Sequence, residues 1–239
     1  IPTFFNRFTF WTHMTEMYPW KSRGYYDLGK AYLVHGKLDS AETLYMKGLE
    51  RNPENKNLYI DLASLYLQKP DYEKLYKSSK KAMEIDPTDP LANYFYAHAL
   101  LRRGEGEEGL QHFERAAFST PKHFHIALEY AMTCQRANQH ERALKAFEFY
   151  LQRDPNSYQA LAGAGNSFAT LGKFDEAEKY WKRSISINPK YFEPYNNLVR
   201  MYIQTKRPGL ASQTYQLLKQ QGGDLDEQTK QIYFSAIQN

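Results

Sequence analysis

The stretch YYDLGKAYLVHGKLDSAETLYMKGLERNP, residues 25–53, ends in a proline that recurs at a constant interval. Prolines stand at positions 53, 87, 121, 155 and 189, each 34 residues from the next. A constant interval of this length is the signature of a repeat protein, in which each repeat is one supersecondary unit. The spacing predicts six repeats, over residues 22–55, 56–89, 90–123, 124–157, 158–191 and 192–225.

Small and large residues alternate in fixed columns of this repeat. The eighth position is small in most repeats, with Gly29, Ala63, Ala97, Ala131, Gly165 and Val199. The twenty-fourth is large in all repeats but one, with Tyr45, Ser79, Phe113, Phe147, Trp181 and Tyr215. Large side chains filling the space left by small ones are typical of close-packed helices. A helix breaker near position 15 (Gly36, Pro70, Gly104, Asn138 or Gly172) predicts a turn, so each repeat is helix A, turn and helix B.

The repeat resembles the tetratricopeptide repeat (TPR) family in length, in column chemistry and in its closing proline. Residues 25–53 and the stretch ALAGAGNSFATLGKFDEAEKYWKRSISINP, residues 160–189, are similar to the family motif. The resemblance covers residues 22 to about 223. It implies an all-α fold, a right-handed α-solenoid of helix-turn-helix repeats, whose helices A line a concave, partner-binding face.

The two ends of the chain are predicted to extend this pattern. Residues 1–21 are in phase with helix B of a half-repeat, and Phe4, Phe8, Trp11, Met14 and Tyr18 would form its buried face. This phase predicts that the given sequence starts in the middle of a repeat, as part of a larger protein. Residues 226–239 are expected to form a capping helix. Its covering side chains would be Leu225, Ile232, Ala236 and Ile237.

Composition excludes several classes of protein. Apolar residues make up 42% of the 239 residues and the net charge is only +4, without the concentrated basic stripe of a nucleic-acid-binding protein. We therefore expect no nucleic-acid partner. One cysteine allows no internal disulfide, and no apolar run reaches the length of a membrane span. The composition does not identify a compartment.

Catalytic and metal-binding patterns are weak. His123 and His125 are close in sequence but lack a third ligand, and Cys134 occupies a core column. The stretch GAGNSF, residues 163–168, places Gly165 in a packing column inside a helix instead of in a phosphate-binding loop. We therefore expect no enzyme activity, no metal site and no cofactor.

The resemblance places a partner-binding groove on particular positions of helix A. Polar side chains interleave there with apolar ones, and Tyr94 and Phe95 are extra to the core columns, either as exposed anchors or as core between repeats. Asn166 and Asn197 each offer a donor and an acceptor to a peptide backbone. The predicted groove consists of Tyr26, Asp27, Lys30, Ile60, Asp61, Tyr94, Phe95, His98, Leu128, Glu129, Met132, Asn166, Asn196, Asn197 and Arg200.

The main hypothesis is a non-enzymatic scaffold that binds a protein or peptide partner in this groove. In an alternative, the chain is an accessory region of a membrane-bound glycosyltransferase-like protein, and so the soluble part of a membrane-associated protein. The stretch NRFTFWTHMTEMYPWKSRGYYDLGKAY, residues 6–32, is similar to the entry into the TPR tail of such proteins. Further alternatives are an envelope or pilus assembly factor and a self-associating repeat protein.

Overall fold

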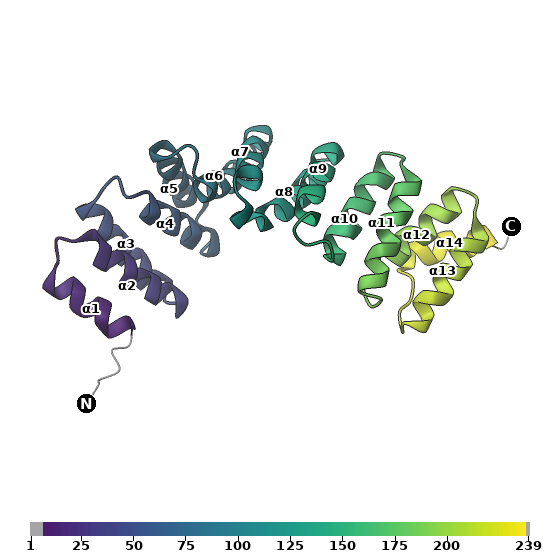
Figure 1. The fold of residues 1–239 in the computed structure, drawn as a ribbon, viewed down its shortest axis with the longest axis horizontal. Coiled ribbons are helices and arrows are strands. Elements are labelled where there is room, and N and C mark those ends of the chain that lie inside the picture. The colour runs from purple at the N-terminus through teal and green to yellow at the C-terminus, as the bar shows by residue number, and fades with distance from the viewer. Residues whose placement is uncertain (1–6, 238–239) are drawn as a thin grey trace, which may run out of the picture. The chain divides into compact units, whose positions relative to one another are not determined.

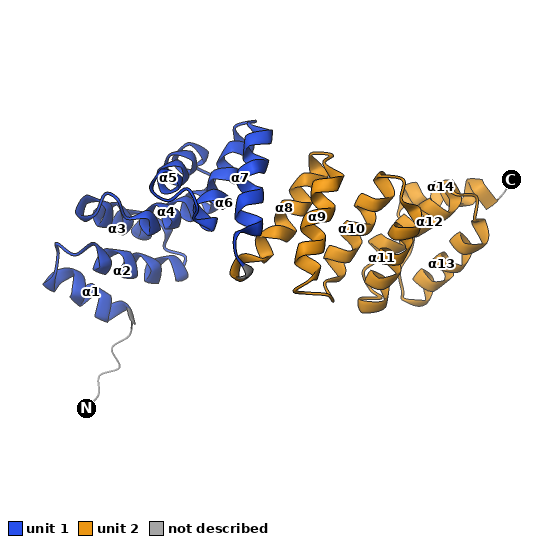
Figure 2. Cartoon of the chain, turned by 45° about the horizontal axis from the view of Figure 1, so that its top comes forward, with its two compact units in different colours: residues 1–120 blue, residues 121–239 orange. Residues whose placement is uncertain are grey.

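The computed structural model describes residues 7–237, apart from the side chains of Arg7 and Pro121. Over that range the chain forms fourteen α-helices, one short 3-10 helix and no strand, which confirms the predicted all-α fold. Phe4 lies outside the described residues. The chain divides into two compact units, residues 1–120 and residues 121–239 (Figure 2).

Unit 1 contains α1 and three helical hairpins, in which α2 pairs with α3, α4 with α5, and α6 with α7 (Figure 1). Short turns between the helices of each hairpin make the two partners antiparallel. The bounds are α1 (Arg7–Met17), α2 (Ser22–Val34), α3 (Leu38–Arg51), α4 (Lys56–Gln68), α5 (Tyr72–Ile85), α6 (Pro90–Arg102) and α7 (Gly106–Ser119).

Unit 2 repeats this arrangement, with α8 against α9, α10 against α11, α12 against α13, and α14 against α12. The bounds are η1 (Pro121–His123), α8 (His125–Arg136), α9 (His140–Leu151), α10 (Tyr158–Thr170), α11 (Phe174–Ile187), α12 (Glu193–Gln204), α13 (Pro208–Gln220) and α14 (Glu227–Ile237).

Local chemistry explains where the helices begin and end. Asp71 and Ser157 accept hydrogen bonds from backbone N–H groups in the first turns of α5 and α10, which satisfies donors that have no partner inside the helix. Gly36 and Gly172 adopt φ angles of +70° and +74° in the turns inside their hairpins. These left-handed angles cost glycine little and end the preceding helix.

The small and large columns meet as the sequence predicts. A Cβ atom added to Gly165 in α10 would lie 2.6 Å from Cδ1 of Trp181 in α11, so only a glycine allows this approach. The Trp181 side chain is 3% exposed. Cys134 is also fully buried, as expected for a core column.

Helices α1 and α14 flank the internal hairpins. In α1, Phe8 packs its ring 4.6 Å from the ring of Tyr32 in α2. In α14, Tyr233 is buried and its hydroxyl donates a hydrogen bond of 2.9 Å to Ser212. Ile232 and Ile237, expected to cover the end of the last hairpin, are instead exposed by 36% and 44%. Tyr233, together with the buried Leu225, performs this covering role, because Tyr233 is the residue that faces α13.

Candidate functional site

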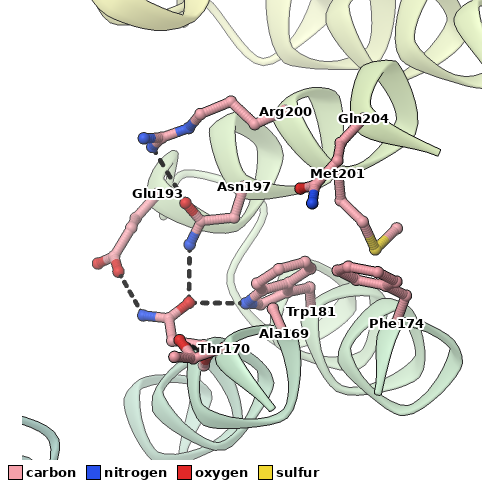
Figure 3. A pocket seen from close by; sticks show the side chains of 10 residues that line it. Ala169, Thr170, Phe174, Trp181, Glu193, Asn197, Arg200, Met201 and Gln204 are labelled. Atoms are coloured by element: carbon pink, nitrogen blue, oxygen red, sulfur yellow. Dashed lines mark hydrogen bonds between the residues drawn. The ribbon is translucent and has the colours of Figure 1, made fainter. Parts of the chain in front are cut away.

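A pocket of about 400 Å³ opens in unit 2 between the helices α10, α11 and α12. One part of its wall is apolar, formed by Phe174, Trp181 and Met201, and Figure 3 shows the Met201 sulfur lying beside the Phe174 ring. The rest of the wall is polar. Its lining residues are Asn166, Ala169, Thr170, Phe174, Trp181, Glu193, Asn197, Arg200, Met201 and Gln204.

The polar side chains form a continuous ladder of hydrogen bonds (Figure 3). Trp181 Nε1 donates to Asn166 Oδ1 over 2.9 Å, and Asn197 Nδ2 donates to the same oxygen over 2.7 Å. Asn166 Nδ2 donates to Glu193 Oε1 over 3.0 Å. Arg200 Nη2 donates to Asn197 Oδ1 over 3.1 Å. The ladder therefore joins α10, α11 and α12 through one central amide.

The capacity for binding a ligand differs between the two asparagines. Both lone pairs of Asn166 Oδ1 are used by Trp181 and Asn197, and one of its two N–H groups is used by Glu193. Asn197 uses one N–H and one lone pair, and so retains one of each. Asn166 is therefore mainly a support for the pocket, whereas Asn197 can still bind a peptide amide.

Arg200 connects the pocket to the start of α14. Its Nη2 lies 3.5 Å from Asp226 Oδ2, and Asp226 caps α14 by accepting from the Thr229 backbone N–H over 2.8 Å. Burial alone would raise the pKa of Asp226, but the Thr229 hydrogen bonds and the Arg200 charge lower it below its ordinary value. The Nε atom of Arg200 is buried and has no acceptor among the described residues. A ligand would therefore meet this guanidinium, whose side chain is 36% exposed, only through its Nη atoms.

Unit 1 brings three predicted groove residues together at a second pocket, of about 470 Å³. Tyr26, Asp27 and Lys30 line it from α2. Arg23 forms an ion pair with Asp27, and Lys30 Nζ donates to the Tyr26 hydroxyl over 3.2 Å. Lys30 Nζ lies 4.0 Å from Asp61 Oδ2. Burial raises the pKa of Asp61, and the nearby Lys30 charge offsets only part of that effect.

Three predicted groove residues are in fact buried. Ile60 and Phe95 are 6% and 8% exposed and belong to the core of unit 1, so neither can act as an exposed anchor. Asn196 is 6% exposed; it donates to the Phe192 carbonyl and accepts from the Asp226 backbone N–H over 2.9 Å. Asn196 thus holds the start of α14 in place. The groove assignments of Ile60 and Asn196 conflict with their burial, and Phe95 follows the second of the two alternatives, core between repeats.

We infer that Phe95 is buried because the preceding repeat leaves room for its ring. Position 24 of one repeat faces position 6 of the next, as shown by the Phe147 ring, which occupies the space where a Cβ on Gly163 would lie. The residue at position 24 before Phe95 is Ser79, the one small member of that column. The Phe95 ring, at position 6, therefore fills the space that an aromatic ring at position 24 fills between other repeats.

The remaining predicted residues lie partly exposed on helices A. Tyr94 is half-buried, with its ring 4.6 Å from His98 and 5.5 Å from Phe113. In unit 2, Met132 is 52% exposed on α8, whereas Leu128 and Glu129 are half-buried there. The structure places none of these five residues in the two pockets described above.

The pocket in unit 2 also contains residues that the groove prediction missed. Phe174, Trp181 and Met201 form its apolar wall. Trp181 was assigned only to the core column. Its position opposite Asn197, at positions 24 and 6 of adjacent repeats, is a signal that could have placed it at the pocket.

Other kinds of site have little support in the described part of the chain. Residues 7–237 contain no group of three or more His, Cys, Asp or Glu side chains that could hold a metal ion. No helix in the same range has the length and apolar character needed to cross a bilayer.

Comparison with known sequences gives a consistent family match. A sequence model of the tetratricopeptide repeat matches residues 21–153, and a second model of the same repeat matches residues 128–192. The first match alone covers more than half of the chain.

Individual proteins similar to this chain have diverse names. "BBSome complex member BBS4" of Bos taurus is 25% identical over 171 residues, which are 72% of this chain and 33% of that protein. "Protein O-mannosyl-transferase TMTC3" of Homo sapiens is 25% identical over 175 residues, which are 72% of this chain and 19% of that protein. This chain thus spans about a third or less of the length of these two relatives.

Among solved structures, YrrB, described as "a TPR protein with an unusual peptide-binding site", aligns with a TM-score of 0.65. The alignment covers 82% of this chain and 97% of YrrB at 18% sequence identity. At this identity the likeness shows a shared fold.

Proposed function

This chain belongs to the tetratricopeptide repeat family, and on that premise we propose that it is a non-enzymatic scaffold that binds an extended segment of a partner protein. The observation that carries the proposal is the pocket in unit 2, which combines an apolar wall with the unused hydrogen-bonding groups of Asn197 and the partly exposed guanidinium of Arg200. An apolar pocket with a few convergent polar groups is the usual form of a binding site.

Each part of this pocket has a separate role in the proposal. The wall of Phe174, Trp181 and Met201 receives an apolar side chain of the partner. Asn197 offers one N–H and one lone pair to the partner's backbone amide. Arg200 donates to a backbone carbonyl or carboxylate. In unit 1, Tyr26, Asp27 and Lys30 form a second contact surface on α2.

Peptide selection tests this proposal. A phage-displayed library of random peptides is selected on the full chain, and a recovered peptide is titrated by fluorescence anisotropy. Loss of a hydrogen bond from a charged donor costs about 1.5–3 kcal/mol, so Arg200→Ala should weaken binding about 10-fold or more. Lys179→Ala, an exposed cation on α11, is the matched control and should leave binding unchanged. Equal affinity of both variants would contradict the assignment of this pocket.

A second candidate function is an accessory region of a membrane-bound glycosyltransferase-like protein. The similarity to a protein named as an O-mannosyl-transferase supports it, because the similarity covers 72% of this chain but only 19% of that protein. The sequence of the complete transcript decides the matter. An open reading frame that continues upstream into many apolar spans would support this candidate, and its absence would refute it.

A further inference from the structure

A third pocket, of about 450 Å³, opens in unit 1 between α3 and α5, the helices B of two successive repeats, with α4 as its floor. Leu49, Leu62 and Tyr66 give it a buried apolar lining, and Met46, which is 50% exposed, stands at its rim. Helix α2 packs against α3, and α6 packs against α4 and α5, so other helices of the array lie on both sides of this pocket. Its volume is in the range of sites for small molecules.

The charged side chains around this pocket are already paired within the chain. Glu42 accepts hydrogen bonds from the Lys74 ammonium and from the Tyr66 hydroxyl, each over 2.9 Å. The other charged lining residues, Glu50 and Lys77, form ion pairs with neighbours on their own helices. A molecule that enters the pocket therefore meets no unpaired charge, which favours a neutral ligand over an ion, because a buried ion needs a partner of opposite charge.

The corresponding space in the next repeat is filled by the protein's own rings. At this pocket, positions 7 and 23 of the repeat hold Leu62 and Ser78. One repeat further along, the same positions hold Tyr96 and His112, which are 5% and 8% exposed and whose ring centroids lie 4.9 Å apart. The His112 ring also has a polar partner, since its Nδ1 lies 2.8 Å from Asn93 Oδ1. The pocket thus lies where the fold elsewhere accepts aromatic rings that carry hydrogen-bonding atoms.

Tyr59 lines the pocket at position 4 of its repeat, and its hydroxyl lacks the partner that a tyrosine has at this position elsewhere. Tyr25 and Tyr195 each donate to the carbonyl oxygen of the proline six residues before them, over 3.2 Å. The half-buried Tyr59 has no hydrogen-bond partner among the described residues, and neither has the Ser78 hydroxyl. The pocket therefore combines its apolar lining with two unused hydroxyl groups, each able to donate and to accept.

We propose that this pocket binds a small, neutral aromatic molecule that carries a hydrogen-bonding group, of the phenol or indole class. Its ring takes the place that Tyr96 and His112 fill one repeat further along, between the Leu62 side chain and the thioether of Met46. Its polar group forms a hydrogen bond with one of the two unused hydroxyls. The pocket lies on α3, α4 and α5, and the pocket of unit 2 lies on α10, α11 and α12, so this inference does not depend on the proposed peptide binding.

Titration of 2-naphthol with the full chain tests the inference. This neutral aromatic alcohol can be excited at wavelengths that tryptophan does not absorb, so its fluorescence anisotropy reports binding directly. We expect saturable binding with a Kd of about 1 mM or lower, as for other ligands of this size. Decahydro-2-naphthol has the same skeleton without the aromatic ring, and in competition it should bind about threefold or more weakly.

Three variants locate the binding. The filled variant, Leu62→Tyr with Ser78→His, copies the rings found one repeat further along and should weaken 2-naphthol binding about tenfold or more, because the space is then occupied. Tyr59→Phe with Ser78→Ala removes both hydroxyls and should weaken it about threefold or more. Met46→Ala removes the rim and should also weaken it about threefold or more. The matched control is Met132→Ala, a 52% exposed methionine on α8, which should bind like the wild type.

Two results would overturn the inference. The first is a wild-type chain that shows no saturable binding of 2-naphthol. The second is a filled variant, folded by circular dichroism, that binds 2-naphthol as tightly as the wild type, because the probe would then occupy another part of the molecule. If the filled variant does not fold, the methionine variants decide, and equal affinities of Met46→Ala and Met132→Ala would overturn the inference in the same way.

Discussion

Exchanging the sizes of Ser79 and Phe95 tests the packing between adjacent repeats. Elsewhere in the chain the same two positions hold Phe147 and Gly163, whose ring and missing Cβ fit together. The double variant Ser79→Phe, Phe95→Gly copies that pair into unit 1. If the core needs one aromatic ring at each contact between adjacent repeats, the double variant should lose far less stability than the sum of the losses in the two single variants.

The expected magnitudes follow from burial. Phe95 is 8% exposed, so its removal costs about 3–5 kcal/mol, and glycine inside a helix adds about 1 kcal/mol. Ser79 is fully buried, so a ring added there beside Phe95 costs about 1–3 kcal/mol through overpacking. The sum is about 5–9 kcal/mol, whereas a complementary exchange should cost only about 1–3 kcal/mol.

Urea unfolding followed by far-UV circular dichroism measures these free energies. Should Phe95→Gly fail to fold, recovery of folding in the double variant reports the same coupling. The control combines Phe95→Gly with Ser184→Phe, because Ser184 is another fully buried serine but lies in unit 2. The stability losses of these two single changes should add in the double variant. A coupling below about 0.5 kcal/mol between positions 79 and 95 would refute the reasoning.

Two other predictions concern charge and backbone. Burial alone would raise the pKa of Glu42, but hydrogen bonds from Lys69, Lys74 and Tyr66 lower it from 4.5 to about 2. Its stabilisation is thus present above pH 4.5 and lost as the pH falls towards 2, so Glu42→Gln should cost about 1–2 kcal/mol at neutral pH and little near pH 2 in urea titrations. Lys206 has a φ of +58°, a left-handed angle that glycine adopts at lower cost. Lys206→Gly should therefore increase the free energy of unfolding by about 1 kcal/mol and raise the thermal midpoint; an unchanged or lower midpoint would contradict this.

The sequence alone was sufficient for the fold because the fold is local and periodic. A 34-residue spacing with one small and one large column determines which faces of the helices meet, and helix ends follow from residues such as Gly36 and Asp71. Part of the candidate site followed as well. Asn166, Asn197 and Arg200 meet because they lie on successive helices A.

The rest of the site depends on residues in different repeats, which a single repeat does not reveal. The sequence left open whether Phe95 is an exposed anchor or core, because its own repeat has no place for it; the space comes from Ser79 on the preceding helix B. Asn196 looked available for a ligand, but the backbone of Asp226 in the next element uses its acceptor. In both cases the deciding partner lies outside the residue's own repeat.

The fit between position 24 of one repeat and position 6 of the next has an evolutionary consequence. Because the matched residues belong to different repeats, the inherited unit of packing is the boundary between two repeats and not the repeat itself. Duplicating or shuffling one repeat would join halves of boundaries that were selected apart, such as Ser79 with Gly163 or Phe147 with Phe95. Any duplication therefore creates at least one new boundary, and new arrays should arise most readily where one side of that boundary is small.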